Sequence, residues 1–275
     1  ALAGAERVFD VMDSEPEDQG GNEPFEIENV KGDLNFKDID FSYVKGEQVL
    51  KHFDLWVKSG QKIAIVGATG SGKTTVVNLL TRFYDIDGGV ITLDGQDIRN
   101  IPVNKLRGSI GIVLQDTVIF SDTIAQNIRY GRIDATDEEI VEAAKIARVD
   151  DFASKLSDGY NTMLTEGGSN LSQGQRQLIS IARAVLADPK ILILDEATSS
   201  IDTRTEMHIQ EAMVALMKGR TSLIIAHRLS TIRDADKIVV ISGGKVVEAG
   251  DHDELLAQKG EYYKLYQSQF AGIAT

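Results

Sequence analysis

The stretch ILILDEATSSID, residues 191–202, carries the strongest fold signal in this chain, because an apolar run leads directly into Asp195 and Glu196. A short apolar run of this kind predicts a buried strand. Two adjacent carboxylates at the end of a buried strand cost free energy unless they bind a cation or take part in proton transfer. Upstream, GATGSGKT at residues 67–74 satisfies the complete G-x-x-x-x-G-K-[ST] pattern. The two stretches together predict a nucleotide-binding α/β protein.

The GATGSGKT stretch has the context that a phosphate loop requires, since an apolar strand (62–67) precedes it and a predicted helix (73–84) follows. In such a loop, backbone N–H groups and the helix N-terminus surround the β- and γ-phosphates. Lys73 supplies a positive charge, and the Thr74 hydroxyl ligates Mg²⁺. The expected nucleotide-binding residues here are Gly67, Thr69, Gly70, Ser71, Gly72, Lys73, Thr74 and Thr75.

In this interpretation, the two carboxylates that follow the apolar run at 191–194 have different roles. Asp195 holds Mg²⁺ through water, as the aspartate of a Walker-B strand does. Glu196 faces the attacking water as general base. The alternative is a solvated strand end with two ordinary acids, and the phosphate loop upstream argues against it.

The stretch LSQGQ, residues 171–175, lies between these two motifs and is a weak signal alone. Ser172 is a good N-cap, and the apolar residues of 173–187 recur at helical spacing, so the residues by themselves indicate a capped helix. Its position ahead of the Asp-Glu pair makes it a candidate for a second function.

The rest of the pattern predicts a P-loop NTPase (RecA-like) α/β core with an antiparallel β subdomain and an inserted α-helical subdomain. Apolar alternation indicates antiparallel strands within 32–57. Further strands are expected at 88–93, at 109–114 and in runs beginning at 190, 221 and 237, and helices at 137–147, 150–156 and 173–187. Because strands resume after this helical stretch, we expect a helical insertion at about 116–188.

The beginning of the chain has a different composition. Residues 1–12 have apolar side chains at helical spacing, and residues 13–24 (DSEPEDQGGNEP) form an acidic, Gly- and Pro-bearing linker. We therefore expect the folded domain to span 25–275. The start has neither an initiator Met nor the features of a signal peptide, which predicts a piece of a longer protein.

Composition excludes several function classes. There are no cysteines, so disulfides, zinc-thiolate sites and thiol catalysis are excluded. The net charge of −13 disfavours nucleic acid as a partner, because such a surface repels phosphate backbones. No apolar run approaches the roughly 20 residues that span a bilayer.

Together these motifs make the chain similar to the nucleotide-binding domain of an ATP-binding cassette (ABC) transporter, and more closely to the exporter branch that includes multidrug and lipid exporters. The resemblance covers about 32–270. It implies an ATPase with ATP and Mg²⁺ as cofactors, whose turnover drives export. It also implies that residues 1–24 follow a missing transmembrane domain, and that this soluble fragment works at the cytoplasmic face of the cell membrane.

The resemblance also assigns roles to single residues. Tyr43 in FSY stacks on adenine, and Gln115 in VLQD senses Mg²⁺, the γ-phosphate and the membrane domain. Glu166 in TEGGS touches the coupling helices of the membrane domain, Asp202 in SSID crosses to the opposite subunit, and His227 in AHR contacts the γ-phosphate. The implied catalytic residues are Glu196, His227, Gln115 and Lys73, and the implied metal ligands are Thr74, Gln115 and Asp195.

In this family two domains resemble a head-to-tail sandwich, in which each ATP lies between the phosphate loop of one subunit and the signature of the other. The signature here is LSQGQ, residues 171–175. Ser172, Gly174 and Gln175 are the implied second set of nucleotide contacts, which suits a helix N-terminus. Gln173 departs from the family, where glycine is common, and Leu164-Thr165 replaces a usual valine-glycine. These departures favour a heterodimer slightly over a homodimer.

Other function classes stay open on the sequence alone. A soluble ABC-type ATPase not tied to transport would have the same motifs, although such proteins usually pair two cassettes or carry basic surfaces. A regulatory nucleotide-binding module without turnover is the third hypothesis, and Glu196 and His227 count against it. A kinase or GTPase would leave LSQGQ unexplained.

Overall fold

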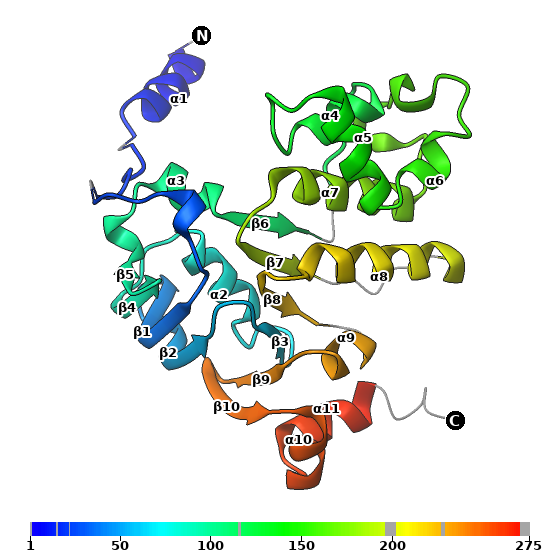
Figure 1. Ribbon diagram of the computed structural model, residues 1–275. Helices are drawn as coiled ribbons and strands as arrows, with labels where there is room; N and C mark the ends of the chain where they lie inside the picture. The colour runs from blue at the N-terminus through cyan, green and yellow to red at the C-terminus, as the bar shows by residue number, and fades with distance from the viewer. Residues whose placement is uncertain are drawn as a thin grey trace.

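The computed structural model describes residues 2–14, 16–21, 23–114, 117–195, 202–226 and 229–269. Within these residues the strands form two sheets, with helices gathered beside the larger one (Figure 1). The larger sheet has the strand order β10 (Lys245–Gly250), β9 (Lys237–Ser242), β3 (Lys62–Val66), β8 (Thr221–Ile225), β7 (Ile191–Asp195) and β6 (Ile110–Val113). All neighbours in it run parallel except β9 and β10.

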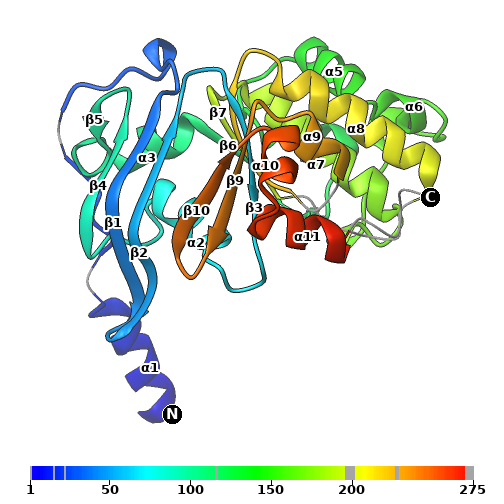
Figure 2. The ribbon, with the colours of Figure 1, turned by 90° about the horizontal axis from the view of Figure 1, so that it is seen from below.

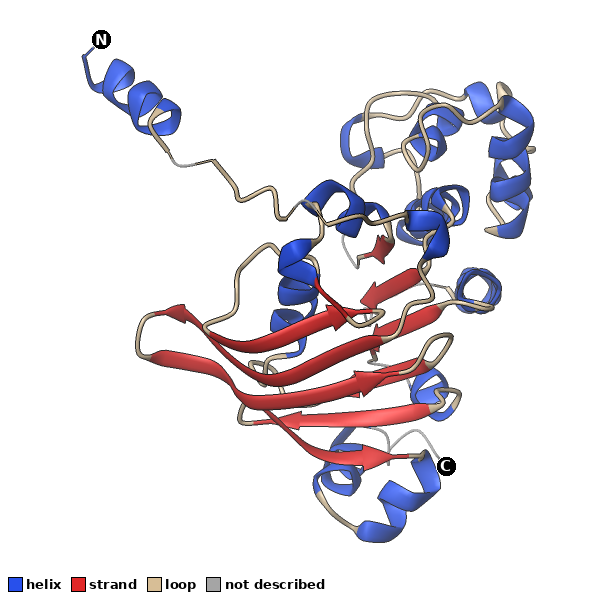
Figure 3. Ribbon diagram, turned by 60° about the vertical axis from the view of Figure 1, so that its left-hand side comes forward, coloured by secondary structure: helices blue, strands red, loops and turns tan. Residues whose placement is uncertain are grey.

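The smaller sheet is antiparallel, with the order β2 (Glu47–Val57), β1 (Leu34–Val44), β4 (Gly88–Leu93) and β5 (Gln96–Asp97). Figure 3 shows its long strands in red, beside the second sheet. The expected α/β core with an antiparallel subdomain is thus confirmed.

Two hydrophobic clusters lie on opposite faces of the larger sheet, because successive side chains of a strand alternate between its faces. In β3, Ile63 and Ile65 join the cluster that includes the antiparallel sheet and α2 (Lys73–Leu80). Ala64 and Val66 join the cluster that includes the helices on the other side. All four side chains are buried, as a parallel strand covered on both faces requires.

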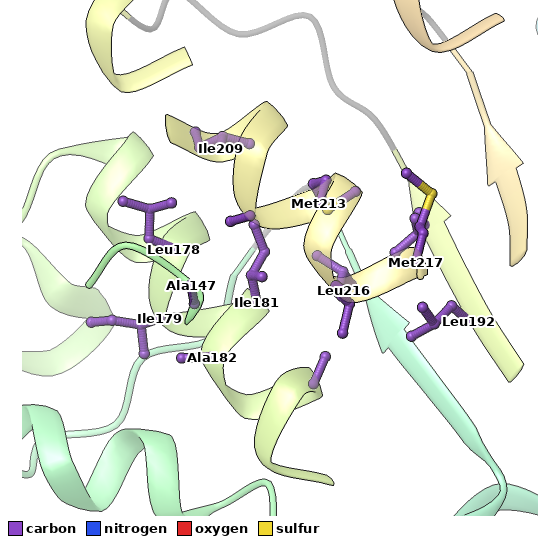
Figure 4. Packing of buried hydrophobic residues seen from close by; sticks show 14 of the residues in the cluster. Ala147, Leu178, Ile179, Ile181, Ala182, Leu192, Ile209, Met213, Leu216 and Met217 are labelled. Carbon is purple, nitrogen blue, oxygen red and sulfur yellow. The ribbon is translucent and has the colours of Figure 1, made fainter. Parts of the chain in front are cut away.

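A group of helices lies in the chain between β6 and β7: α4 (Ile124–Arg129), α5 (Asp137–Ile146), α6 (Asp150–Ala153) and α7 (Gln173–Ala187). The bounds expected for α7 are confirmed. Its apolar face packs on α8 (Thr203–Met217), as Figure 4 shows for Ile181 and Met213. Ile181 is fully buried.

The other helices are short or terminal. They are α1 (Leu2–Met12), α3 (Val103–Gly108), α9 (Leu229–Arg233), α10 (His252–Gln258) and α11 (Glu261–Gln269), with 3-10 turns η1 (Ile27–Asn29), η2 (Ile98–Asn100), η3 (Gly159–Asn161) and η4 (Glu166–Gly168). Figure 2 shows α10 and α11 together beside β10. None of the helices in the described ranges is long and apolar enough to cross a membrane.

Three sequence expectations differ from the structure. The helix expected at 150–156 is shorter, because α6 ends at Ala153. The helix after the phosphate loop ends at Leu80 rather than at residue 84, because Arg82 adopts a left-handed conformation (φ 51°) that a helix does not continue through. Part of the expected acidic linker is held on the domain: Asp18 accepts a 3.0 Å bond from Arg82 Nη2, and the Gln19 carbonyl accepts a 2.9 Å bond from the Val103 amide. Helix α1 projects away from this anchored stretch (Figure 3).

Candidate functional site

The phosphate loop lies between the carboxyl end of β3 and the start of α2, and its backbone path depends on two glycines. A Cβ on Gly67 would lie 2.3 Å from the Ile241 carbonyl oxygen. Gly72 has φ +110°, and a Cβ there would lie 2.8 Å from Leu50 Cδ2. A Cβ on Gly70 would meet nothing within 4 Å, so that side of the loop is open to a ligand.

Lys73 begins α2 and curls back over the loop, where its Nζ donates to the carbonyl oxygens of Gly67 (2.8 Å) and Ala68 (2.9 Å). Burial lowers the pKa of Lys73, and the negative charge of Asp195 opposes that shift. Strand β3, which leads into the phosphate loop, and strand β7, which ends at Asp195, flank β8 in the same parallel sheet. The sheet therefore brings the predicted phosphate-binding lysine and the predicted metal-binding aspartate to one edge.

The loop's own polar groups fit an anion. The Ser71 Oγ is buried and has no hydrogen-bond partner among the described residues, although a buried hydroxyl is normally paired. Thr74 is exposed at the first turn of α2, and Thr75 beside it is buried. Thr69 lies exposed in the loop. An unpaired hydroxyl, a lysine and a helix N-terminus are the groups that hold phosphate in such loops.

Tyr43, the predicted adenine contact, lines a groove of about 520 Å³ that extends to Gly70. Its side chain is 44% exposed, and its hydroxyl donates to Thr75 Oγ1 (3.2 Å) while accepting from Asn78 Nδ2 (3.0 Å). The ring meets Tyr84 edge-on, with 4.9 Å between ring centroids. The groove thus joins an aromatic surface to the phosphate loop.

Asn78 and Tyr84 were missed by the sequence analysis, although they orient Tyr43. Nothing in the sequence marks them, because Asn78 lies on the exposed side of an ordinary helix and Tyr84 beyond the helix end.

The LSQGQ stretch forms the N-terminus of α7, as predicted. Ser172 is the N-cap: its Oγ accepts from the Gln175 amide (3.2 Å), while the Ser172 amide donates to Gln175 Oε1 (2.9 Å). Gly174 is buried and Gln173 is exposed. The hydrogen bonds of this stretch among the described residues are local ones at the start of α7, and none of them reaches the phosphate loop.

The predicted coupling residues lie at exposed turns. Glu166 begins η4, where Gly167 has a left-handed backbone (φ 67°). Asp202 caps α8 by accepting from the Thr205 amide (3.0 Å), and this bond lowers the pKa of its carboxyl. Asp202 therefore stabilises the start of α8 in its own chain, and its predicted contact with an opposite subunit would be an additional role.

Three predicted residues, Gln115, Glu196 and His227, lie outside the described residues. Their roles stay predictions. The neighbouring strands β6, β7 and β8 end at Val113, Asp195 and Ile225, one or two positions before these residues, at the same edge of the sheet as the phosphate loop.

The comparisons with known proteins agree with this geometry. The family model described as ABC transporter matches residues 50–199. An ABC transporter ATP-binding protein of Bacillus subtilis is 56% identical over 270 residues, which are 98% of this chain and 45% of that protein. A fatty acid ABC transporter ATP-binding/permease protein of Mycobacterium bovis is 54% identical over 264 residues, 96% of this chain and 42% of its own length.

Exporters also appear among the similar proteins. An ATP-dependent lipid A-core flippase of Syntrophus aciditrophicus is 50% identical over 269 residues, 98% of this chain and 45% of its own. A solved bacterial Atm1-family ABC exporter with ATP bound matches with a TM-score of 0.87 and 39% identity, over 100% of this chain and 48% of that one. The chain thus spans about half the length of these relatives. It is similar in sequence and fold to part of an ABC exporter, and it belongs to the ABC transporter family.

Proposed function

We propose that this chain drives export by closing on a second nucleotide-binding domain around ATP and by hydrolysing that ATP to separate again. The observation that carries the proposal is the division of the site. One part, with Lys73, Ser71 and Asp195, lies at the sheet edge, and the other is the N-terminus of α7. Each part offers anion-binding groups, and a second copy or homologue can supply the missing half.

The residues divide the chemistry as follows. Tyr43 offers its ring to adenine, while the loop amides and Lys73 hold the phosphates. Thr74, Gln115 and Asp195 would hold Mg²⁺, which supplies positive charge to the β- and γ-phosphate oxygens when bound. Glu196 accepts a proton from the attacking water, and His227 holds the γ-phosphate.

The opposite half-site is supplied by the partner. The Ser172 hydroxyl accepts the cap bond with a lone pair, so its own proton stays available to a phosphate oxygen. The buried Gly174 lets the helix N-terminus approach closely, and Gln175 holds Ser172 in place. Gln173 is exposed at this helix start, so a partner would meet it, and this supports the slight preference for a heterodimer.

The other partner in this proposal is a transmembrane domain, contacted through Glu166 and joined through residues 1–24 at the cytoplasmic face of the membrane. The matched relatives include an ATP-binding/permease protein, and they extend well beyond the length of this chain. Their names concern a fatty acid in one case and lipid A-core in another, so a lipid-like cargo is the class they support.

Substituting Glu196→Gln tests the proposal. We expect the variant to bind ATP as tightly as the unaltered chain, to lose turnover, and to form an ATP-dependent dimer that light scattering after gel filtration detects. Lys73→Ala is the matched control, which should lose binding and dimerisation together. Turnover at the unaltered rate in Glu196→Gln would remove Glu196 from the general-base role, and saturation with ATP without any dimer would refute the shared site.

A further inference from the structure

Helix α7, which carries the signature at its N-terminus, is fastened near its other end by one arginine. Arg183 Nε donates to the Asn127 carbonyl oxygen (2.6 Å), Nη1 to the Val118 carbonyl oxygen (2.6 Å), and Nη2 to Asn127 Oδ1 (2.7 Å). All three acceptors belong to residues 117–127, the crossover segment that begins two residues after Gln115 and ends in α4. A guanidinium is a planar fork of fixed geometry, so these bonds set both distance and orientation.

Asn127 makes the crossover segment a rigid partner for this fork. Its side chain is fully buried. Its Oδ1 accepts from the Phe120 amide (2.9 Å), and its Nδ2 donates to the carbonyl oxygens of Phe120 (3.0 Å) and Thr123 (3.0 Å). The segment therefore folds around one amide side chain, and Arg183 donates to the same Oδ1 that accepts from the Phe120 amide.

Aromatic rings cover the fork. Phe120 and Tyr130 are stacked, with centroids 4.2 Å apart, and the Arg183 guanidinium lies 5.4 Å from the Phe120 centroid. Burial lowers the pKa of Arg183, but an arginine stays charged in proteins. Val118 and Tyr130 line a groove of about 350 Å³ together with Arg183, so the fork forms part of its wall.

A second connection joins the crossover segment to the signature from the opposite direction. The Gly167 amide donates to the Ile119 carbonyl oxygen (3.3 Å). Arg176, on the first turn of α7, donates through Nη1 to the carbonyl oxygens of Leu171 (2.8 Å) and Gly168 (3.3 Å). A closed path thus runs from the crossover segment to the loop before the signature, along α7, and back through Arg183.

We propose that Arg183 is a positioning residue, whose fork locks the signature helix to the crossover segment and thereby sets where Ser172 meets the partner's nucleotide. A partly buried charge is a costly means of packing two elements, since apolar side chains do this without desolvating an ion. The three directional bonds to one segment account for that cost. This inference rests on the proposed shared site, because only there does the placement of Ser172 affect turnover.

The first test separates nucleotide binding from dimerisation in the Glu196→Gln background, with Arg183→Ala and Arg183→Lys. We expect both variants to bind a fluorescent ATP analogue within about twofold of the parent, since Arg183 lies far along the chain from the phosphate loop. ATP-driven dimerisation should weaken by roughly tenfold or more, the effect of losing one or two charge-assisted bonds. Lysine keeps the charge but cannot span three acceptors, so it should not restore the parent's behaviour.

Arg148→Ala is the matched control. Arg148, in the turn between α5 and α6, also binds a neighbouring helix, through a 2.8 Å pair with Glu211 of α8, but it is half exposed and its side-chain bond goes to α8 rather than to the crossover segment. We expect its dimerisation to equal that of the parent. Equal losses in Arg148→Ala and Arg183→Ala would show a general loosening of the helices and overturn the positioning role, as would dimerisation at the parent's level in Arg183→Lys.

Amide hydrogen exchange of the nucleotide-free monomer decides the inference independently of dimerisation. In Arg183→Ala we expect faster exchange in residues 117–131 and also in 171–176, with α2 and β1 unchanged. Faster exchange in 117–131 alone would show that the fork does not hold the signature, and the inference would fall. If the Glu196→Gln parent itself forms no dimer with ATP, the proposed function falls instead, and the exchange result still decides about Arg183.

Discussion

Ser172 allows its structural and functional tasks to be separated, because it caps α7 and also offers a hydroxyl proton to a partner's nucleotide. Two substitutions distinguish these tasks. Ser172→Ala replaces the hydroxyl by a residue that caps helices poorly, whereas Ser172→Gly also removes the hydroxyl but is tolerated at an N-cap.

The magnitude follows from the capping box. In Ser172→Ala the 3.2 Å bond from the Gln175 amide is lost, while the 2.9 Å bond from the Ser172 amide to Gln175 Oε1 can remain. The side chain is exposed, so no cavity adds to the cost. We therefore expect the free energy of unfolding to fall by about 1 kcal/mol in Ser172→Ala and by only about a few tenths of a kcal/mol in Ser172→Gly. Loss of a hydrogen bond to a charged phosphate costs about 1.5–3 kcal/mol, so both variants should lose roughly 10- to 100-fold in ATPase rate.

Urea unfolding and steady-state ATPase assays on the same preparations give the two quantities. The two variants should differ in stability and agree in lost activity. Full activity in Ser172→Gly would refute the reasoning, because it would show that the Ser172 hydroxyl is not needed at the partner's nucleotide.

Three further predictions concern the loop, the helical packing and the histidines. Gly67→Ala should abolish nucleotide binding in a fluorescence titration, because its Cβ would lie 2.3 Å from a backbone carbonyl oxygen; binding at the unaltered affinity would contradict the loop geometry. Ile181→Ala should lower the free energy of unfolding in urea by about 2–5 kcal/mol, since the fully buried side chain packs between α7 and α8, and a loss under about 1 kcal/mol would contradict that packing. NMR titration should place the pKa of His52 above 6.5, because it bonds the carboxylate of Asp38, and that of His252 below 6.5, because burial disfavours its charged form. The contribution of His52 to stability is then present below pH 6.5 and is lost as the pH rises through its folded pKa. The contribution of His252 is present above pH 6.5 and is lost as the pH falls through its folded pKa. A lower pKa for His52 than for His252 would contradict these two environments.

The sequence predicted those parts of the fold in which local pattern and tertiary packing agree. Helix α7 matches its expected bounds because Ser172 caps it and its apolar stripe faces the core. Strand β7 was evident because four buried apolar residues precede Asp195. Both signals are local, so a single chain displays them.

The differences arise where distant residues decide. Asp18 is bonded by Arg82, a contact across 64 positions that the acidic composition of the linker cannot show. The same Arg82 ends α2 in a left-handed conformation without a glycine to announce it. The role of Arg183 was not predicted. Its acceptors lie in the crossover segment, 56 and 65 positions away in the chain, and helical periodicity carries no information about such contacts.

The shared nucleotide site is the central claim, and the ATPase rate of this chain as a function of its own concentration tests it most directly. Glu196→Gln serves as the blank. If two copies, or this chain and an added homologous domain, build the site, the rate should rise faster than linearly at low concentration and vanish in the blank. A rate strictly proportional to concentration over the whole range, absent in the blank, would contradict the account, because one chain alone would then hold a complete site.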